Sequence, residues 1–576
     1  MIMRMRTWWR GRGFRTATVI PSITVIALLG ASSDANHPAS AHHRRHHHHP
    51  GVLRVGRWKA IAGQYRSIQA AVDAAKPGDW ILVGPGDYHE RADHRKKRGP
   101  QPSDTPAAVI IGKAHIHLRG MNRRRVVVDG TKPGSLRCSR EEKDQDFGVK
   151  GSDGKPLGRN GIVAWKANGV SIDNLTACNF LNGAGSVGNE IWWNGGDGTG
   201  RIGLHNLEGS YLTATSTFYK DGSTAASYAI FASNASGGRW DHMYASNMSD
   251  SNYYVGACQQ VCNQTVDHVW SQYSSQGYSG TNAGGKVIIE HSEFDHNKSG
   301  FTAGALNNDD WPAPQNGACP KNGTSPITHT YSCWVFMHNY VHDNNNPNVP
   351  GEGIASAAPT GTGLLLYGGR DDTIRDNFFA RNGAWGVIFF TYPTTETPPP
   401  DVIAAGDDCR GGIKTGPPSN ACIFDDWGNA LLDNAFSDNG WFKRRAGPGG
   451  NASNADFGEI TSTSAPTNCY HGNVELGGGP VTSSPPGLQQ SKPACDHHTV
   501  PPDNNPEMTN DLACDTQGLA GVLPGVNSTP CSPGSYYPQQ TKVPMPPVPA
   551  HLKTIPNPCA DVPANPWCRV RPGRTR

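Results

Sequence analysis

The amino-acid sequence predicts an all-β protein, a solenoid of the right-handed parallel β-helix type, and two observations carry this prediction. The first is a seven-residue phrase made of a polar pair, a large or β-branched residue and a closing Asn. It occurs at residues 173–179, 241–247, 291–297, 338–344, 376–382 and 433–439. The second is the spacing of the units, 26 residues from Asp241 to Asp267 and 24 from Asp267 to His291. That length suits one coil of three strands that stacks on its neighbours.

The composition of the phrase indicates what each position does in such a coil. Asn tolerates left-handed backbone angles, and its amide can bond the same residue in the next coil, so the closing Asn is expected in a stacked turn. The recurring Phe, Tyr and Val are expected to form apolar columns inside the solenoid. Asn-x-Ser/Thr triplets at Asn174, Asn247 and Asn297 therefore indicate ladder positions and not glycosylation.

Residues 1–41 have the pattern of an export signal. A basic stretch with five Arg precedes the short apolar run from Thr16 to Gly30, and small residues follow. The run is too short for a comfortable membrane span, so a secreted protein with no membrane attachment after signal removal is expected, and an uncleaved N-terminal anchor is the alternative. Residues 42–63, with a His/Arg-rich run, are expected to form a linker; metal scavenging by that run is the other hypothesis.

Charge and cysteine content agree with export. Charged residues make up 17% of the chain and the formal net charge is +3, which gives no indication of a nucleic-acid partner. The 14 Cys are even in number, and in an exported chain close pairs favour disulfides over zinc, which needs a second pair or well-spaced His. The candidate disulfides join Cys258 with Cys262, Cys319 with Cys333, Cys409 with Cys422 and Cys559 with Cys568.

The expected β-helix domain covers residues 64–446 and opens with a capping helix. Ser67 is a good N-cap, the apolar residues 68, 71, 72 and 75 share one helical face, and Pro77-Gly78 ends the helix. A short helix of this kind covers the open end of the first coil. Residues 447–576 lose the regular phrase and are Pro-rich and Cys-containing, so an irregular tail tied by disulfides is expected there.

Two segments carry a resemblance to a known superfamily. The segment YRSIQAAVDAAKPGDWILVGPGDYHE (65–90) resembles the opening of secreted right-handed parallel β-helix proteins of the pectin-lyase-like superfamily, and RDNFFARNGAWGVIFF (375–390) resembles their coil repeats. The resemblance covers roughly Tyr65 to Phe442 and implies a monomer that acts on polysaccharide, since members include lyases, hydrolases and epimerases of acidic sugars. The complete motifs of pectate lyases and polygalacturonases are absent, so no single activity follows.

The candidate site combines one loop with the coils around it. Asp309 and Asp310 are proposed as catalytic carboxylates and, with Asp295, as ligands for Ca²⁺, a cation that prefers oxygen ligands. His296, His342 and Arg370 are proposed as further catalytic residues, on the expectation that stacked coils place them on one face. Asn307, Asn308, Trp311 and Asp343 are proposed to bind substrate. The alternative is that these are solvated turn residues.

Two classes of function remain open on the sequence. The first is an exported carbohydrate-active enzyme, a lyase or a hydrolase, for which convergent acids and a basic group in one groove would be needed. The second is a non-catalytic surface or matrix protein whose solenoid face binds glycan or protein.

Overall fold

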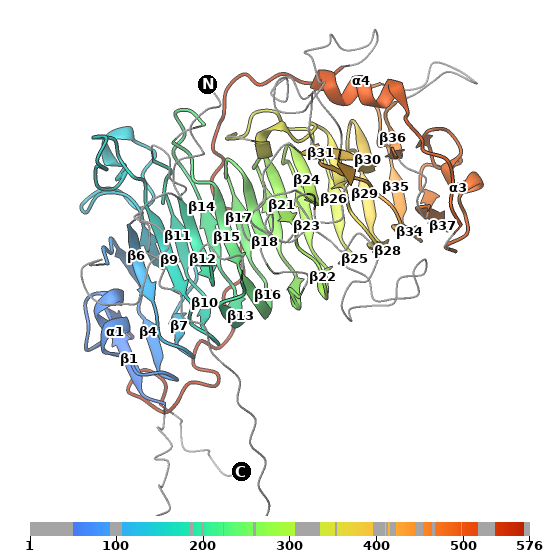
Figure 1. Ribbon diagram of the computed structural model, residues 1–576. Helices are drawn as coiled ribbons and strands as arrows, with labels where there is room; N and C mark the ends of the chain where they lie inside the picture. The colour runs from blue at the N-terminus through green and yellow to red at the C-terminus, as the bar shows by residue number, and fades with distance from the viewer. Residues whose placement is uncertain are drawn as a thin grey trace, which may run out of the picture. The chain divides into compact units, whose positions relative to one another are not determined.

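The computed structural model describes residues 50–92, 106–183, 188–196, 201–222, 224–256, 258, 261–305, 334–351, 354–394, 409, 413–414, 422–443, 453–462, 467–496, 498–515 and 536–569. Within this part of the chain the fold is the predicted right-handed parallel β-helix. Each coil contributes one strand to each of three long parallel sheets, and the strands follow one another in chain order along the stack (Figure 1).

Sheet 1 has 12 strands. In order they are β1 (Val52–Val55), β4 (Trp80–Val83), β7 (His117–Gly120), β10 (Ser171–Asp173), β13 (Leu204–Ser210), β16 (Ala235–Asp241), β19 (Gln264–Asp267), β22 (Val287–Glu290), β25 (Trp334–Met337), β28 (Thr373–Arg375), β34 (Ala430–Leu432) and β37 (Cys469–His471).

Sheet 2 has 11 strands. They are β5 (Gly86–Tyr88), β8 (Val126–Asp129), β11 (Thr176–Cys178), β14 (Thr213–Thr215), β17 (Tyr244–Ser246), β20 (Trp270–Gln272), β23 (Glu293–Asp295), β26 (Tyr340–His342), β29 (Phe378–Ala380), β35 (Ala435–Ser437) and β38 (Val474–Glu475).

Sheet 3 also has 11 strands. They are β6 (Ala107–Ile111), β9 (Asn160–Trp165), β12 (Asn189–Asn194), β15 (Tyr228–Ser233), β18 (Ser251–Gly256), β21 (Gln276–Thr281), β24 (Ser299–Gly304), β27 (Thr362–Tyr367), β30 (Trp385–Phe390), β36 (Ala455–Ile460) and β39 (Ser483–Ser484).

The remaining described elements are short. Strands β2 (Arg57–Trp58) and β3 (Ile61–Ala62) pair with each other, and β33 (Cys422–Phe424) pairs with β31 (Tyr392–Thr394) and β32 (Ile413–Lys414), all antiparallel. The helices are α1 (Ile68–Ala74), α3 (Leu488–Ser491) and α4 (Pro506–Asp515), with 3₁₀ turns at Glu142–Asp144 and Ile354–Ala357. Among the described residues, no helix is both long enough and apolar enough to cross a membrane.

The first coil begins earlier than the sequence indicated. Helix α1 forms as predicted, with the Ser67 side chain accepting a hydrogen bond from the Ala70 N–H, and it buries Ile68, Ala71 and Val72. However, β1 precedes it and pairs with β4, so residues 51–62 belong to the solenoid and not to a linker. The prediction was wrong here because a single strand of four residues, flanked by glycines, carries no repeat.

The phrase itself occupies two corners of each coil. In the phrases that begin at residues 291, 338, 376 and 433, the first residue takes a left-handed conformation between sheets 1 and 2, and the sixth does so between sheets 2 and 3, as at His338 (φ 56°) and Asp343 (φ 52°). In the phrases that begin at residues 173 and 241, the second and seventh residues hold these positions. In the later coils the residue before the Asn takes the left-handed conformation, whereas Asn174, Asn179 and Asn247 take it themselves, as the sequence had suggested. The Asn of the later coils turns its amide inward instead.

Two ladders of buried Asn side chains run behind these corners. In one, the Nδ2 atoms of Asn297, Asn344 and Asn382 donate to the Oδ1 of the next Asn at 3.1, 3.2 and 3.2 Å, ending on Asn439. In the other, Asn339, Asn377 and Asn434 do the same at 3.1, 2.9 and 3.0 Å, ending on Asn473. The predicted stacking of the closing Asn is confirmed, and the second ladder uses the Asn of the polar pair.

Aromatic residues fill the space between the sheets, as the recurring Phe and Tyr predicted. Phe379 stacks on Phe436 with ring centroids 5.4 Å apart, and Tyr278 stacks on Phe301 at 4.5 Å. All four side chains are buried. Each coil thus buries one ring against the next, which stabilises the stack mainly by removing apolar surface from water.

The chain after residue 446 is more regular than predicted. Strands β36 to β39 extend the solenoid to Ser484, because the Asn ladder continues through Asn473 to the Gln489 side chain. Residues 536–569, which we call the strap, then run back along the coils. Gln540 donates to the Val349 carbonyl, Asn247 to Pro546, and Trp567 Nε1 to the Ile61 carbonyl in the first coil.

Five disulfides join cysteines in the described part of the chain. The predicted pairs Cys258–Cys262, Cys409–Cys422 and Cys559–Cys568 are present. Cys138–Cys178 and Cys469–Cys495 were not foreseen, because their partners are 40 and 26 residues apart and meet only through coil stacking.

The fourth predicted disulfide, between Cys319 and Cys333, is not among these five. Cys319 lies outside the described residues, and so does Cys333, which directly precedes the first described residue of β25. The pairing of Cys333 with Cys319 therefore stays a prediction from their spacing in the sequence.

Candidate functional site

Ionisable residues gather on the outer face of sheet 2 and at its corner with sheet 3. Strand β23 pairs with β26 so that Glu293 faces Tyr340 and Asp295 faces His342. Because side chains alternate along a strand, Phe294 and Val341 point into the core while these four point outward. His296, Asp343 and Arg381 stand at the corner that follows, in left-handed conformations (φ 55°, 52° and 54°).

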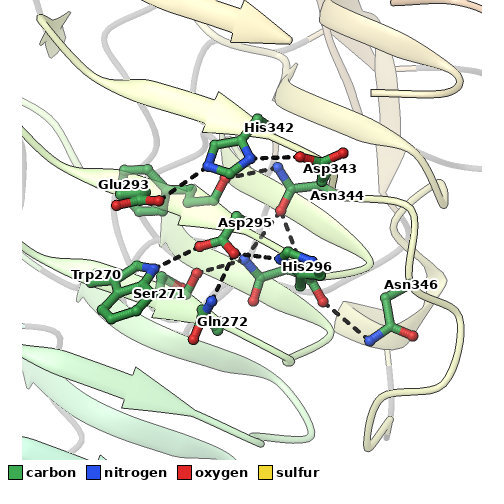
Figure 2. Close-up of polar contacts among 12 residues, drawn as sticks. Trp270, Ser271, Gln272, Glu293, Asp295, His296, His342, Asp343, Asn344 and Asn346 are labelled. Atoms are coloured by element: carbon green, nitrogen blue, oxygen red, sulfur yellow. Dashed lines mark hydrogen bonds and ion pairs between the residues drawn. The ribbon is translucent and has the colours of Figure 1, made fainter. Parts of the chain in front are cut away.

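Asp295 and His296 form a dyad at the centre of this site (Figure 2). The Asp295 side chain is only 3% exposed, and its two oxygens accept hydrogen bonds from Trp270 Nε1 and Gln272 Nε2, both at 2.7 Å. His296 Nδ1 contacts Asp295 Oδ2, and its ring is 48% exposed. The hydrogen bond to Asp295 raises the pKa of His296, against an opposing effect of burial. A buried carboxylate thus orients an accessible imidazole.

His342 lies between two carboxylates. Its Nε2 is 3.1 Å from Glu293 Oε1 and its Nδ1 is 2.7 Å from Asp343 Oδ2. A ring that donates from both nitrogens carries both protons, so this arrangement favours the imidazolium form. Burial lowers the pKa of His342, but the hydrogen bonds to Glu293 and Asp343 outweigh it and the net pKa is raised above 6.5.

A pH dependence of stability follows from His342. Because its pKa is higher in the folded chain, its stabilising contribution is fully present below the unfolded value of about 6.5 and is lost as the pH rises through the folded value. We expect the urea midpoint of the wild type to fall as the pH rises through this range. The midpoint of His342→Gln should fall by less, because Gln cannot gain or lose a proton between Glu293 and Asp343. If the urea midpoints of the two proteins changed in parallel between pH 5.5 and pH 8.5, His342 would not be the source of the pH dependence.

Arg381 supplies the cationic side of the site. Its Nε lies 3.0 and 3.1 Å from the two oxygens of Asp343, and its Nη2 donates to the Tyr340 hydroxyl at 3.1 Å. These hydrogen bonds raise the pKa of Arg381. They also lower the pKa of Asp343, against burial, with His342 contributing in the same direction. The guanidinium remains 44% exposed and can meet an anionic ligand.

Arg370 does not belong to this site, contrary to the sequence prediction. It is buried, its Nε donates to the Asp425 carbonyl, and its guanidinium lies over the Trp427 ring at 4.8 Å. The sequence prediction placed Arg370 at the wrong corner of its coil. Arg370 precedes the sheet 1 strand β28, whereas Asp343 follows the sheet 2 strand β26. The arginine at the matching corner of that coil is Arg381, which follows β29 by one residue.

The predicted loop residues Asn307, Asn308, Asp309, Asp310 and Trp311 lie outside the described residues. The predicted Ca²⁺ site can therefore be considered only at Asp295. One oxygen each from Asp295 and Glu293 and a nitrogen of His342 lie within 4.8 Å of one another. Ca²⁺ takes six to eight oxygen ligands, and here one donor is nitrogen and both Asp295 oxygens already accept hydrogen bonds. This part of the site does not fit Ca²⁺.

Sequence reasoning missed Glu293, Tyr340 and Arg381. Tyr340 stacks on the His342 ring at 3.7 Å and on Phe378 in the next coil at 5.1 Å. The signal that could have found all three is the frame of the phrase itself. Its third and fifth residues face outward on sheet 2, and its sixth stands at the corner.

Comparisons with known proteins return structural neighbours only. No family model and no curated protein matches the chain. Among solved structures, it resembles the A-module of the mannuronan C-5 epimerase AlgE4 from Azotobacter vinelandii, at 13% identity and a TM-score of 0.40, over 71% of this chain and 90% of that one. It also resembles an alginate lyase from Paenibacillus sp. str. FPU-7, at 10% identity and a TM-score of 0.34, over 74% and 96%. A further neighbour is the pectate lyase Pel9A, at 11% identity and a TM-score of 0.33, over 74% and 79%.

Proposed function

We propose that the chain is an exported enzyme that cleaves an acidic polysaccharide by elimination, with His296 as the base. The observation that carries the proposal is the Asp295–His296 dyad on the outer face of sheet 2. Asp295 accepts a hydrogen bond from the Nδ1–H of His296, so the lone pair of the neutral imidazole is at Nε2, on a ring that is half exposed. An oriented His beside a fixed carboxylate is a common arrangement for general base catalysis.

The cations around His296 suit a uronic acid substrate. Removing a proton next to a carboxylate builds negative charge on that group, and nearby fixed cations stabilise such charge. Arg381 is close enough to act on the pKa of His296, and the imidazolium of His342 lies in the same set of contacts. The Arg381 guanidinium, which is 44% exposed, can therefore face the carboxylate of a sugar whose ring lies over Tyr340.

The proposed step balances without a further reagent. His296 Nε2 takes the proton from the carbon that bears the carboxylate. The electron pair of that C–H bond forms a C=C bond to the neighbouring carbon, whose bond to the glycosidic oxygen breaks. The leaving oxygen takes a proton from Tyr340 or from water. His296 then returns its proton to solvent, and a deprotonated Tyr340 takes one from solvent. The product carries an unsaturated sugar at its new end.

A hydrolase is the second candidate, because Glu293 and Asp295 present oxygens within 4.8 Å of each other. Retaining glycosidases use carboxyl groups about 5 to 5.5 Å apart, one as acid and one as nucleophile. In this alternative Asp295, held by Trp270 and Gln272, is the nucleophile. Glu293, which is 44% exposed, is the acid.

Export is part of the same proposal. Five disulfides in the described residues favour an oxidising compartment, where such bonds persist. An extracellular polymer is then within reach of the outer face of sheet 2.

A product assay separates the candidates. The full chain is incubated with polymers of several uronic acids and with neutral polysaccharides, and both new reducing ends and the ultraviolet absorbance of unsaturated sugars are followed. Reducing ends with unsaturation on a uronic acid polymer are the expected result. Reducing ends without unsaturation would mean that the chain is a hydrolase and does not cleave by elimination. Binding without any product would assign the chain to non-catalytic glycan-binding proteins.

A further inference from the structure

The corner between sheets 1 and 2 carries a column of stacked imidazoles that the proposed activity does not use. His242, His268, His291 and His338 occupy the same left-handed position in four consecutive coils, with φ between 49° and 56°. Adjacent ring centroids lie 4.8, 5.2 and 5.5 Å apart, and the planes are within 27° of parallel. The backbone does not require His there, since Asp376, Asp433 and Gly472 hold this position in later coils.

Carboxylates accompany the first three of these rings. Asp241, Asp267 and Glu290 directly precede His242, His268 and His291, whereas Met337 precedes His338. The Nδ1 atoms of His268 and His291 both lie near the same oxygen, Asp267 Oδ1, at 2.6 and 3.1 Å. The imidazoles of two coils therefore turn their nitrogens to one buried carboxylate.

The first ring of the column faces its own carboxylate. His242 Nδ1 lies 2.9 Å from Asp241 Oδ2, in a geometry that does not form a hydrogen bond. Ligand atoms of Asp241, His242 and His268 lie within 4.8 Å of one another, and so do those of Asp267, His268 and His291. His268 belongs to both sets, and each set combines two imidazoles with one carboxylate.

We propose that this patch binds one divalent transition-metal ion of the Zn²⁺ type, held by His268 together with either Asp267 and His291 or Asp241 and His242. Imidazole nitrogens combined with carboxylate oxygens suit Zn²⁺ and Cu²⁺, while Ca²⁺ and Mg²⁺ prefer oxygen alone. The nitrogens that now face carboxylates give up their protons when the metal binds. The ring spacing set by coil stacking brings the donors together before any metal is present.

Arg239 acts as a positioning residue for this site. Its Nη2 contacts Asp267 Oδ2 and lies 3.7 Å from Asp241 Oδ1. The guanidinium thus holds one oxygen of Asp267 and leaves the other for the ring nitrogens. It also places a positive charge beside the metal position, which weakens binding of a dication.

The test uses the full chain in a background where the six His between residues 42 and 49 are replaced by Ser, since they lie outside the described residues and would also bind metal. Zn²⁺ affinity is measured by competition with a coloured chelator, and the melting temperature is recorded with and without Zn²⁺. We expect one Zn²⁺ per chain and a rise in melting temperature, because an ion that binds only the folded chain stabilises it. Ca²⁺ is expected to give neither effect.

Substitutions in the column locate the ion. Asn accepts left-handed backbone angles, so His268→Asn is expected to fold, to lose more than about tenfold in Zn²⁺ affinity and to show no melting shift. His338→Asn is the matched control, in the same column but without a carboxylate partner, and should bind Zn²⁺ as the background does. Arg239→Gln should bind it more tightly. A folded background that binds no Zn²⁺, or equal Zn²⁺ affinities for His268→Asn and His338→Asn, would overturn the proposal.

Discussion

Asn382→Ala is expected to lower the free energy of unfolding by about 4 kcal/mol. The amide of Asn382 donates to the Val341 carbonyl and to Asn439 Oδ1, and its oxygen accepts from the backbone N–H and the side chain of Asn344. Alanine leaves these buried partners without their bonds, and each unsatisfied buried group costs about 1 to 3 kcal/mol. Urea denaturation of the variant measures the loss.

Asn346→Ala provides the control for this ladder. The Asn346 amide donates to the His296 carbonyl at an exposed position, where water can replace it, so its loss should cost less than about 1 kcal/mol. Similar urea midpoints for Asn382→Ala and the wild type would mean that the ladder adds little to stability beyond the apolar core.

His296→Asn is expected to reduce kcat/KM on the uronic acid polymer by about 10² to 10⁴, the usual contribution of a general base. Asn keeps the left-handed backbone of this position, so the fold and the sheet 2 face stay in place. Because the pKa of His296 is raised by Asp295, activity of the wild type should increase as the pH rises through that pKa. Initial rates of unsaturated product formation measure both effects.

Asp295→Asn tests the dyad separately, since Asp295 positions the imidazole and does not touch the proton. Its pH profile should shift to lower pH, because the neutral amide no longer raises the pKa of His296, and its rate should fall. His338→Asn, at the other corner, should keep wild-type activity. If His296→Asn still formed unsaturated product at the wild-type rate, the base of the elimination would have to be another residue.

The sequence was informative about the fold because a β-helix repeats its constraints in every coil. The closing Asn could be assigned to a stacked turn since only a few side chains bond both their own coil and the next. The strand β1 and the coils after residue 446 were missed because there the pattern is carried by single strands or by Gln489 in place of Asn. A repeat pattern therefore identifies the interior coils of a solenoid and misses the coils at its two ends.

The site was predicted less well, for a physical reason. Asp295, His296, His342 and Asp343 lie together, as expected from the sequence, because they hold the fifth and sixth positions of two consecutive phrases. Arg370 was placed with them although it lies a third of a coil away, because a polar run before a strand looks the same in sequence as one after it. Only the strand boundaries in three dimensions separate the two corners, and they assign that role to Arg381.

The strap changes how the whole array must fold. In a plain solenoid each coil contacts only its neighbours, so either end can fray without the other. Here Trp567 packs against the first coil, near Trp80 and Leu82, and Tyr536 N–H donates to the Phe442 carbonyl near the last coils. The strap is made after all of the coils, and it covers the coil that was made before the others. That amino-terminal coil stays incompletely covered until the strap has emerged, which makes this interval a period of risk for aggregation.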